Sequence, residues 1–139
     1  MSDEEVARVV FGESRGEPMA GQRAVAHSIY NRTRHPGYPN TVHEVVNQTW
    51  GGGRHQYETL DDRGHSRNWE EARRNNSREY QNAMSAAHEA RTNPSADPTR
   101  GAVDFASRDP WPSTNDNDHW RATNKQQIGN QYFVKREPR

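Results

Sequence analysis

Apolar positions near the start of the chain repeat at helical spacing. The first stripe consists of three valines: Val6, Val9 and Val10. Ser2 and Glu5 match the S-x-x-E capping box that begins many helices, so we predict a first helix over residues 3–13. One further turn along the same face reaches Glu13, and a stripe that should pack inward therefore ends in a carboxylate.

The helical pattern breaks at Gly16 and resumes at Pro18, which suits the first turn of a helix. The small and apolar positions of the next stripe are Ala24, Val25, Ser28 and Ile29. They predict a second helix over residues 18–34, ending at the turn "HPGYPN". Thr41 and Glu44 form a second capping box, which predicts a short helix that ends before "WGGGRH".

Residues 50–75 show almost no apolar periodicity. This stretch is polar and contains several glycines, so we predict a long loop shaped by function. Helical spacing returns after Asn76, which can cap a third long helix that ends ahead of Pro94. The expected buried face of that helix is formed by Tyr80, Ala83, Met84, Ala87 and Ala90.

The last third of the chain has strand patterns. The segment "GAVDFAS" alternates like a strand, and "QQIGNQYFVK" is typical of two strands joined by Gly129 and Asn130, a two-residue hairpin signal. No repeat or internal linker interrupts the chain. We predict one α+β domain over residues 1–139, predominantly helical, with a small antiparallel sheet at its C-terminal end.

Composition narrows the possible functions. The 139 residues are 29% hydrophobic, with a mean hydropathy of -1.38, which predicts a thin core and argues against a large apolar pocket. Basic and acidic residues number 19 each, so no strong field attracts nucleic acid or an anionic membrane. Cysteine is absent, and the histidines lack an H-E-x-x-H spacing. We therefore expect no metal and no cofactor.

The sequence also bears on location. No segment approaches the ~20 apolar residues of a membrane span, and the start "MSDEEVARVV" lacks the basic and apolar regions of a signal peptide. We expect a monomer without membrane insertion. If its target lies outside the cytoplasm, delivery would depend on another system.

Four segments in order carry a family resemblance. They are "FGESRGEPMAGQRAVAHSIYNRT", "YPNTVHEVVNQ", "HQYE" and "DPTRGAVDFAS…IGNQYFV". Together they cover nearly the whole chain and resemble the SleB-type cell wall hydrolase family, the catalytic domain of spore-cortex lytic enzymes. The first motif is specific, because it fixes E-x-R-G-E-P, G-Q-x-A-V-A and N-R at set offsets.

The resemblance implies a lysozyme-like fold, peptidoglycan glycan strands as the partner, and lytic transglycosylase chemistry. It implies that the first glutamate of the motif, Glu13, is the catalytic acid and base. Glu13 followed by Ser14 is also similar to the Glu-Ser pair of other lytic transglycosylases. Such an enzyme acts at the bacterial cell wall, in the periplasm or outside the cell.

The chemistry of Glu13 can also be argued from the residues. Cleaving a glycosidic bond needs a proton on the leaving oxygen, and a carboxyl group supplies it near neutral pH when an apolar site raises its pKa. In a lytic transglycosylase the same carboxylate then acts as base for the sugar's own 6-hydroxyl, so one glutamate suffices. The alternative for Glu13 is a capping or ion-paired carboxylate, with Arg15 or Arg32 as partner.

Two other functions remain open. A hydrolytic muramidase needs a second carboxylate near Glu13, and Glu58 and Asp61 are the candidates. A non-catalytic peptidoglycan-binding module would bind without cleavage. A nucleic-acid binder is disfavoured, because basic and aromatic residues are scattered along the chain. We assign Glu17 a structural role, binding backbone N–H groups at the start of the second helix.

Candidate sugar contacts come from amide and aromatic side chains, which hydrogen-bond the edge of a pyranose and stack on its face. The candidates are Gln56, Tyr57, Asn31, Phe105 and Trp111. Asn31 lies at a helix end, where binding of backbone carbonyls competes with a sugar contact. The chain departs from the family pattern after Phe105, where Ser107 stands in place of the usual asparagine.

The acidic first helix runs directly into the motif that contains Glu13 and leaves no room for a removable leader in the chain as given. We therefore predict synthesis in the cytoplasm and delivery by phage lysis or by a secretion system. An antibacterial phage endolysin is slightly favoured over a secreted effector.

Overall fold

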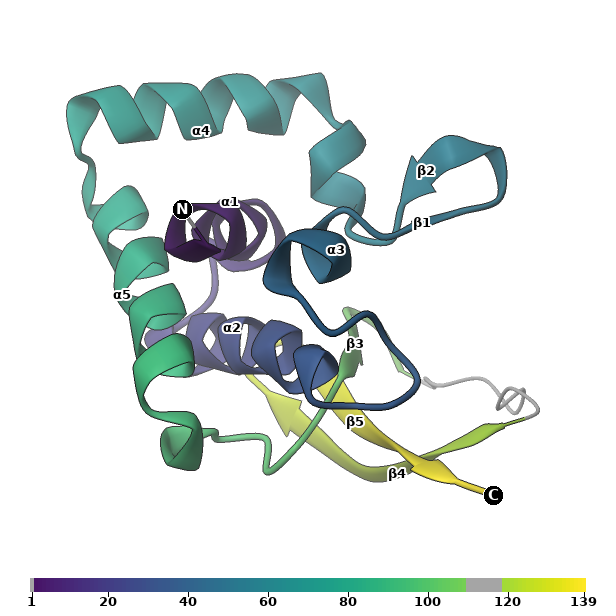
Figure 1. Ribbon diagram of the computed structural model, residues 1–139. Coiled ribbons are helices and arrows are strands. Elements are labelled where there is room, and N and C mark those ends of the chain that lie inside the picture. Colours follow the sequence, from purple (N-terminus) through teal and green to yellow (C-terminus); the bar gives the residue numbers. More distant parts are fainter. Residues whose placement is uncertain (1, 110–118) are drawn as a thin grey trace.

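A computed structural model describes residues 2–109 and 119–139 of the chain (Figure 1). The helices are α1 (Ser2–Ser14), α2 (Met19–Thr33), α3 (Val42–Val46), α4 (Arg63–Asn75) and α5 (Arg78–Thr92), with short 3-10 turns η1 (Gly51–Gly53), η2 (Glu58–Asp61) and η3 (Pro94–Ala96). The strands are β1 (Thr49–Trp50), β2 (Arg54–His55), β3 (Asp104–Ala106), β4 (Trp120–Ile128) and β5 (Gln131–Pro138). The predicted α+β class, mostly helical with a small sheet, is confirmed.

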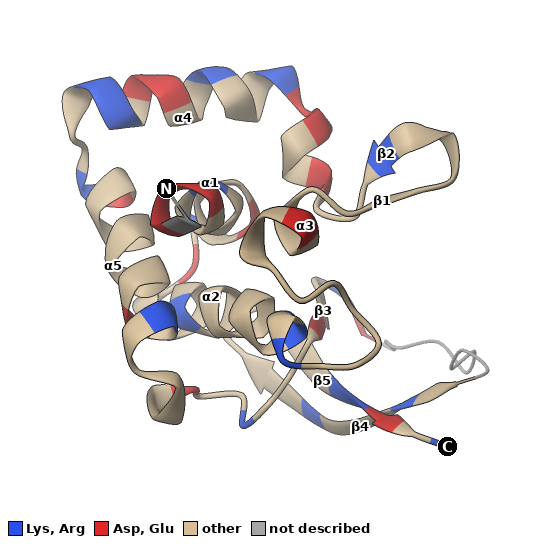
Figure 2. Ribbon diagram, in the orientation of Figure 1, with Lys and Arg blue, Asp and Glu red and all other residues tan. Residues whose placement is uncertain are grey.

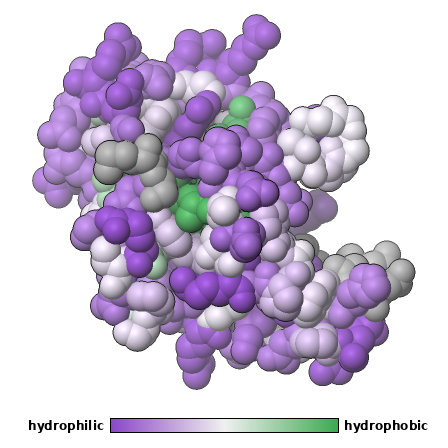
Figure 3. All heavy atoms as spheres, in the orientation of Figure 1, coloured by the Kyte–Doolittle hydropathy of each residue, from purple (hydrophilic) through white to green (hydrophobic). Residues whose placement is uncertain are grey.

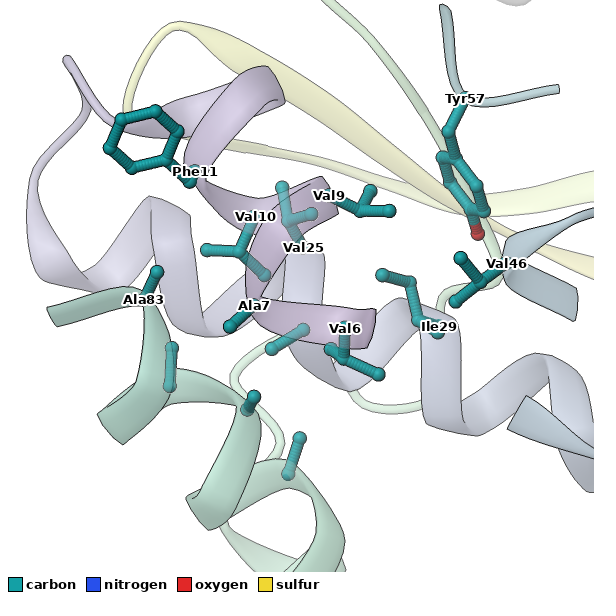
Figure 4. Packing of buried hydrophobic residues seen from close by; sticks show 14 of the residues in the cluster. Val6, Ala7, Val9, Val10, Phe11, Val25, Ile29, Val46, Tyr57 and Ala83 are labelled. Carbon is teal, nitrogen blue, oxygen red and sulfur yellow. The ribbon is translucent and has the colours of Figure 1, made fainter. Parts of the chain in front are cut away.

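Helix α1 lies in the middle of the helices and contacts the other four (Figure 1). The three valines of its predicted stripe are fully buried, and Figure 4 shows them facing side chains of α2 and α3. The side chain of Ser2, the predicted cap, lies outside the described part of the chain. Both the first helix and the second, α2, match their predicted ranges to within a residue at each end.

Helix α3 begins with the predicted capping box. The Thr41 hydroxyl accepts a hydrogen bond from the Glu44 backbone N–H at 3.2 Å and donates one to the Glu44 carboxylate at 2.8 Å. The chain then enters the β1–β2 hairpin, so the helix ends before the glycine run, as expected.

The predicted long loop over residues 50–75 is wrong, because this stretch contains the β1–β2 hairpin, η2 and the helix α4. Helix α4 buries only Trp69 and Ala72, and two positions are too few to produce an apolar period. Its remaining surface is charged, and Figure 2 shows basic and acidic residues alternating along it. Asp62 caps the helix by accepting two backbone N–H groups of the first turn, at 2.8 and 3.2 Å.

The cap of α5 also differs from the prediction. Asn76 ends α4 in the left-handed conformation, with a φ of 49°, which asparagine tolerates better than most residues. The next residue, Ser77, caps α5 by accepting the N–H of Tyr80 at 3.2 Å. The buried face of α5 is mostly alanine, which lets α5 pack closely on α1 and α2: Ala83, Ala86, Ala87 and Ala90.

The C-terminal strands form an antiparallel sheet in the order β3-β5-β4. Strands β4 and β5 meet at Gly129 and Asn130, which confirms the predicted hairpin. Glu17 joins this turn to the helices, because its carboxylate accepts the backbone N–H of Asn130 at 2.7 Å and its side-chain amide at 3.2 Å. Glu17 is therefore structural, as expected, but its partner is the hairpin turn, whereas we predicted the start of α2. Among the described residues, no helix has the length and apolarity that crossing a membrane requires.

Candidate active site

Glu13 lies in the last turn of α1, directly after the buried valine stripe. Its side chain is partly buried, and one carboxylate oxygen accepts a weak hydrogen bond from the Thr59 backbone N–H at 3.4 Å. Its backbone carbonyl accepts the side-chain amide of Gln131 from β5 at 3.3 Å. Glu13 is thus held between η2 on one side and the sheet on the other.

The close approach of η2 to α1 depends on the residue before Glu13. A Cβ added to Gly12 would come 1.7 Å from the Thr59 hydroxyl oxygen and 2.5 Å from the Thr59 Cβ. Only a glycine at this position lets η2 pack against the helix. Gly12 therefore sets the distance between Glu13 and the segment that contains Gln56, Tyr57 and Glu58.

A solvent-open cavity of about 400 Å³ lies beside Glu13. It is walled by the last turns of α1 and α2, the segment leading into η2, the strand β3 and the first residue of β5. The lining residues are Glu13, Arg32, Gln56, Tyr57, Glu58, Asp104, Phe105, Ala106, Ser107, Arg108 and Gln131. This cavity brings together residues that lie more than a hundred positions apart in the sequence.

The electrostatic setting of Glu13 favours its protonated form. Burial is the largest influence and raises the pKa of the Glu13 carboxyl above its ordinary value, and the nearby Glu58 charge raises this pKa further. The Thr59 N–H and the His65 side chain act in the opposite direction. The net result is a carboxyl with a raised pKa on the wall of an open cavity, which is the condition for a general acid.

Three of the candidate sugar contacts line the cavity. Gln56 is exposed there, and Phe105 is half-buried. Tyr57 is only 3% exposed, stacks on Phe105 with ring centroids 6.2 Å apart, and has a pKa that burial raises to about 12. Figure 4 shows its hydroxyl directed toward Val46 in the core. Gln56 and Phe105 therefore present surface to a ligand, whereas Tyr57 supports Phe105 from behind.

Asn31, another candidate, is not placed at the cavity. Asn31 donates its amide to the Asp97 carboxylate at 2.8 Å and to the Ala102 carbonyl at 2.9 Å, and it does not line the cavity. These contacts hold the loop before β3 against α2. Trp111 lies outside the described residues.

Arg32 is a cavity residue that we expected to bind backbone carbonyls at the end of the second helix or to pair with Glu13. Arg32 is only 2% exposed, and its buried guanidinium has protein partners: it donates to the Val103 carbonyl at 2.6 Å and pairs with the Asp104 carboxylate at 3.4 Å. Asp104 also pairs with Arg136 at 3.1 Å. Arg32 follows Ile29 by three positions and so falls on the predicted buried face of the second helix. A cation on a buried face needs a partner of opposite charge, and this was the signal in the sequence for the pairing of Arg32.

The two candidates for a second carboxylate have different surroundings. Glu58 is exposed and lines the cavity with Glu13. Asp61 is bound to His55, accepting its backbone N–H at 2.8 Å and lying 2.7 Å from its ring nitrogen, and it does not line the cavity. In the described part of the chain no group of three acidic or histidine side chains has the geometry of a metal site.

Comparison with known families gives one match that spans most of the chain. The model of the family described as Cell Wall Hydrolase matches residues 16–134. This range includes Gln56, Tyr57 and Phe105 and begins shortly after Glu13.

Two solved structures are similar over almost the whole chain. The catalytic domain of the germination-specific lytic transglycosylase SleB from Bacillus anthracis has a TM-score of 0.59 and 26% identity, covering 96% of this chain and 93% of that one. The catalytic domain of the Bacillus cereus SleB protein has a TM-score of 0.57 and 27% identity, and the match covers 96% of this chain and 90% of that one.

Curated relatives match over a shorter stretch. A spore cortex-lytic enzyme of Bacillus cereus is 54% identical over 41 residues, which are 30% of this chain and 16% of the relative. The spore cortex-lytic enzyme of Bacillus subtilis is 49% identical over 41 residues, which are 30% of this chain and 13% of the relative. The matched stretch is therefore a small part of each relative's length.

Proposed function

The chain belongs to the cell wall hydrolase family, and from this premise we propose that it degrades peptidoglycan by cleaving the bond between N-acetylmuramic acid and N-acetylglucosamine as a lytic transglycosylase. We propose that residues 1–139 form one catalytic domain. In support, a solved lytic transglycosylase catalytic domain covers 96% of this chain and is itself covered to 93%.

The observation that carries this proposal is the position of Glu13. Its carboxyl has a raised pKa, lies on the wall of an open cavity and accepts the Thr59 backbone N–H, and its backbone carbonyl accepts the Gln131 side-chain amide. A carboxyl with a raised pKa keeps its proton to a higher pH than an exposed glutamate does and can release it to a bound glycosidic oxygen.

The reaction then needs one side chain in two roles. Protonated Glu13 donates its proton to the oxygen that leaves with N-acetylglucosamine, and the bond from that oxygen to C1 of the muramic acid breaks. The Glu13 carboxylate next takes the proton of the 6-hydroxyl on the same muramic acid. That oxygen bonds to C1 and forms the 1,6-anhydro ring, which returns Glu13 to its protonated state.

We propose that Gln56 and Phe105 contact the glycan in this cavity. The exposed Gln56 amide supplies hydrogen bonds to hydroxyl or acetamido groups, and the Phe105 ring packs on the face of a sugar. Tyr57 stacks behind Phe105 and fixes its ring. Since the side-chain amide of Asn31 is already bound to Asp97 and Ala102, we leave it out of the contact set.

A hydrolytic muramidase is the second candidate, because the Glu58 carboxylate lines the same cavity as Glu13. In that reaction Glu58 would activate a water molecule and the products would have reducing ends. We favour the transglycosylase because Glu58 is exposed and no contact fixes its carboxylate in the described part of the structure. Phage or secretion-system delivery to the wall stays a prediction from the sequence.

Glycan cleavage by three single variants tests the proposal. Glu13→Gln keeps the shape of the side chain and removes the transferable proton, so we expect near-complete loss of cleavage with folding intact. Glu17→Gln is the matched control, because it changes a carboxylate only four residues away in the sequence that contacts the hairpin turn, and it should remain active. Glu58→Gln should also keep most of the activity.

Substantial cleavage by folded Glu13→Gln protein would overturn the assignment of the acid. If each of the single variants Glu13→Gln and Glu58→Gln lost activity, the muramidase would be favoured. Binding of peptidoglycan without cleavage by the unmodified protein would identify a binding module.

A further inference from the structure

The β1–β2 hairpin displays an unusually exposed aromatic side chain. Trp50 is 54% exposed, and the other large hydrophobic side chains among the described residues are buried or half-buried. The adjoining tip is formed by Gly51–Gly53, where an added Cβ would meet nothing within 4 Å. In Figure 3 the region of this hairpin projects as a pale patch from the polar surface around it. Trp50 therefore has no part in the buried core.

The register of the hairpin shows which side chains share a face with Trp50. Trp50 pairs with Arg54, and the backbone N–H of Gln56 donates to the carbonyl of Gln48 at 2.8 Å, which extends the ladder toward the cavity. Side chains alternate between the two faces of a ribbon, and directly paired residues share a face. Gln48, Trp50, Arg54 and Gln56 therefore lie on one face.

The opposite face of the hairpin contacts η2 through one of its residues. It carries Thr49 and His55, which pair with each other, and His55 is bound to Asp61 in η2. Since Gln56 lines the cavity, the free face that it shares with Trp50 is the one continuous with the cavity. At about 3.3 Å of rise per strand residue, Trp50 lies about 7 Å farther along the ribbon than Gln48 and Gln56.

We propose that Trp50 is an outer binding platform for the glycan strand, stacking on a sugar ring that lies beyond the cavity. This inference rests on the proposed function and extends it to a second contact along the same polymer. The indole offers a flat apolar face to the C–H face of a pyranose, and the neighbouring Arg54 guanidinium supplies hydrogen-bond donors for its hydroxyl and acetamido groups. The bare glycine tip leaves the ring uncovered for this contact.

The platform would make affinity depend on glycan length. A fragment short enough to occupy only the cavity would not reach Trp50, whereas a long strand would contact both places at once. A second contact on one polymer multiplies the binding strength without changing the reacting groups. Trp50 is therefore a specificity residue for polymeric substrate and takes no part in proton transfer.

Binding measured in a Glu13→Gln background tests the platform without cleavage. The ligand is purified glycan strands stripped of peptide, sorted by length. Trp50→Ala should weaken the binding of long strands by about tenfold, equivalent to about 1.4 kcal/mol, and Trp50→Phe should restore most of it. Thr49→Ala is the matched control on the opposite face of the same hairpin and should bind like the parent. In the enzyme with Glu13 intact, the reduction in cleavage rate caused by Trp50→Ala should grow with the length of the glycan strand.

Equal binding of long strands by the Trp50→Ala and parent proteins would overturn the platform while leaving the proposed function intact. A loss of the same size in Thr49→Ala would also overturn it, because the effect would then come from the hairpin as a whole. Association of Trp50 with phosphatidylglycerol vesicles in place of glycan would assign the side chain to a lipid surface. Absence of cleavage by the unmodified enzyme would instead refute the proposed function.

Discussion

Replacing Gly12 by alanine tests whether the packing of η2 against α1 positions the Glu13 carboxyl, the proposed catalytic acid. The new methyl group would lie 1.7 Å from the Thr59 hydroxyl oxygen and 2.8 Å from the Thr59 Cγ2. Thr59 belongs to η2 and its backbone N–H contacts Glu13. The substitution therefore pushes the cavity wall away from Glu13 and leaves every proposed reacting group in the chain.

The expected size of the effect follows from these distances. Carbon and oxygen atoms in contact prefer a separation near 3.5 Å, so η2 must move by about 2 Å. Overpacking of this kind costs about 1–3 kcal/mol, of which the better helix propensity of alanine offsets about 1 kcal/mol. We expect a lower melting temperature by a few degrees. Because a displacement of about 1 Å can reduce a rate about a hundredfold, activity should fall much more than stability.

The assay compares melting temperature and glycan cleavage in the unmodified protein, in Gly12→Ala, in Thr59→Gly, in the double variant of both and in Gly16→Ala. Thr59→Gly removes the three atoms that the new methyl group would meet, so the Gly12→Ala/Thr59→Gly double variant should recover activity relative to Gly12→Ala. Gly16→Ala is the matched control, because an added Cβ there meets nothing within 4 Å. Unchanged activity in Gly12→Ala, or no coupling between the two substitutions, would refute the reasoning.

Further predictions concern stability and binding at the same cavity. Glu13→Gln should raise the melting temperature at pH 7, because burial makes the ionised Glu13 carboxylate unfavourable in the folded state. This advantage should disappear near pH 4, below the ordinary pKa of 4.5, where the carboxyl is protonated in both the folded and the unfolded state. Calorimetry would contradict the burial of Glu13 if the melting temperatures of Glu13→Gln and of the unmodified protein differed by the same amount at every pH from 4 to 7. Gln56→Ala should reduce the rate of cleavage and leave the melting temperature unchanged. Tyr57→Ala should reduce the rate of cleavage and also lower the melting temperature, because Tyr57 is buried. Tyr57→Phe should raise the melting temperature, since the buried hydroxyl has no hydrogen-bond partner among the described residues; a lower value would show that the hydroxyl is satisfied. Asp104→Asn should destabilise the protein, because it removes the partner charge of the buried Arg32, and an unchanged denaturation midpoint would count against that pairing.

Much of the fold was predictable because local signals and tertiary packing agree. The valine stripe predicted α1, and the Gly129-Asn130 turn predicted the β4–β5 hairpin. Helix α4 was missed because it buries only Trp69 and Ala72, and the rest of its surface faces solvent. Its start signal was present in Asp62, which alone is common in turns as well as in helix caps.

The site was predictable only in part, because its members come from distant segments. The family motif predicted Glu13 as the catalytic acid, which stays a prediction, and the position of Glu13 after a buried stripe accounts for its raised pKa. For Arg32 we favoured binding of nearby backbone carbonyls, which is common for an arginine in a last helical turn, over a place at the site. Its pairing with Asp104 depends on a strand that follows some seventy residues later, and no local pattern contains that information.

The chemical form of the released glycan ends tests the central claim most directly. Purified peptidoglycan digested by the unmodified protein should yield fragments whose muramic acid ends carry the 1,6-anhydro ring, lighter by one water than reducing ends and resistant to borohydride reduction. Mass spectrometry before and after that reduction distinguishes the two. Anhydro ends from the unmodified protein, and none from Glu13→Gln, are the predicted result. Reducible ends from the unmodified protein would contradict the account and identify a hydrolase.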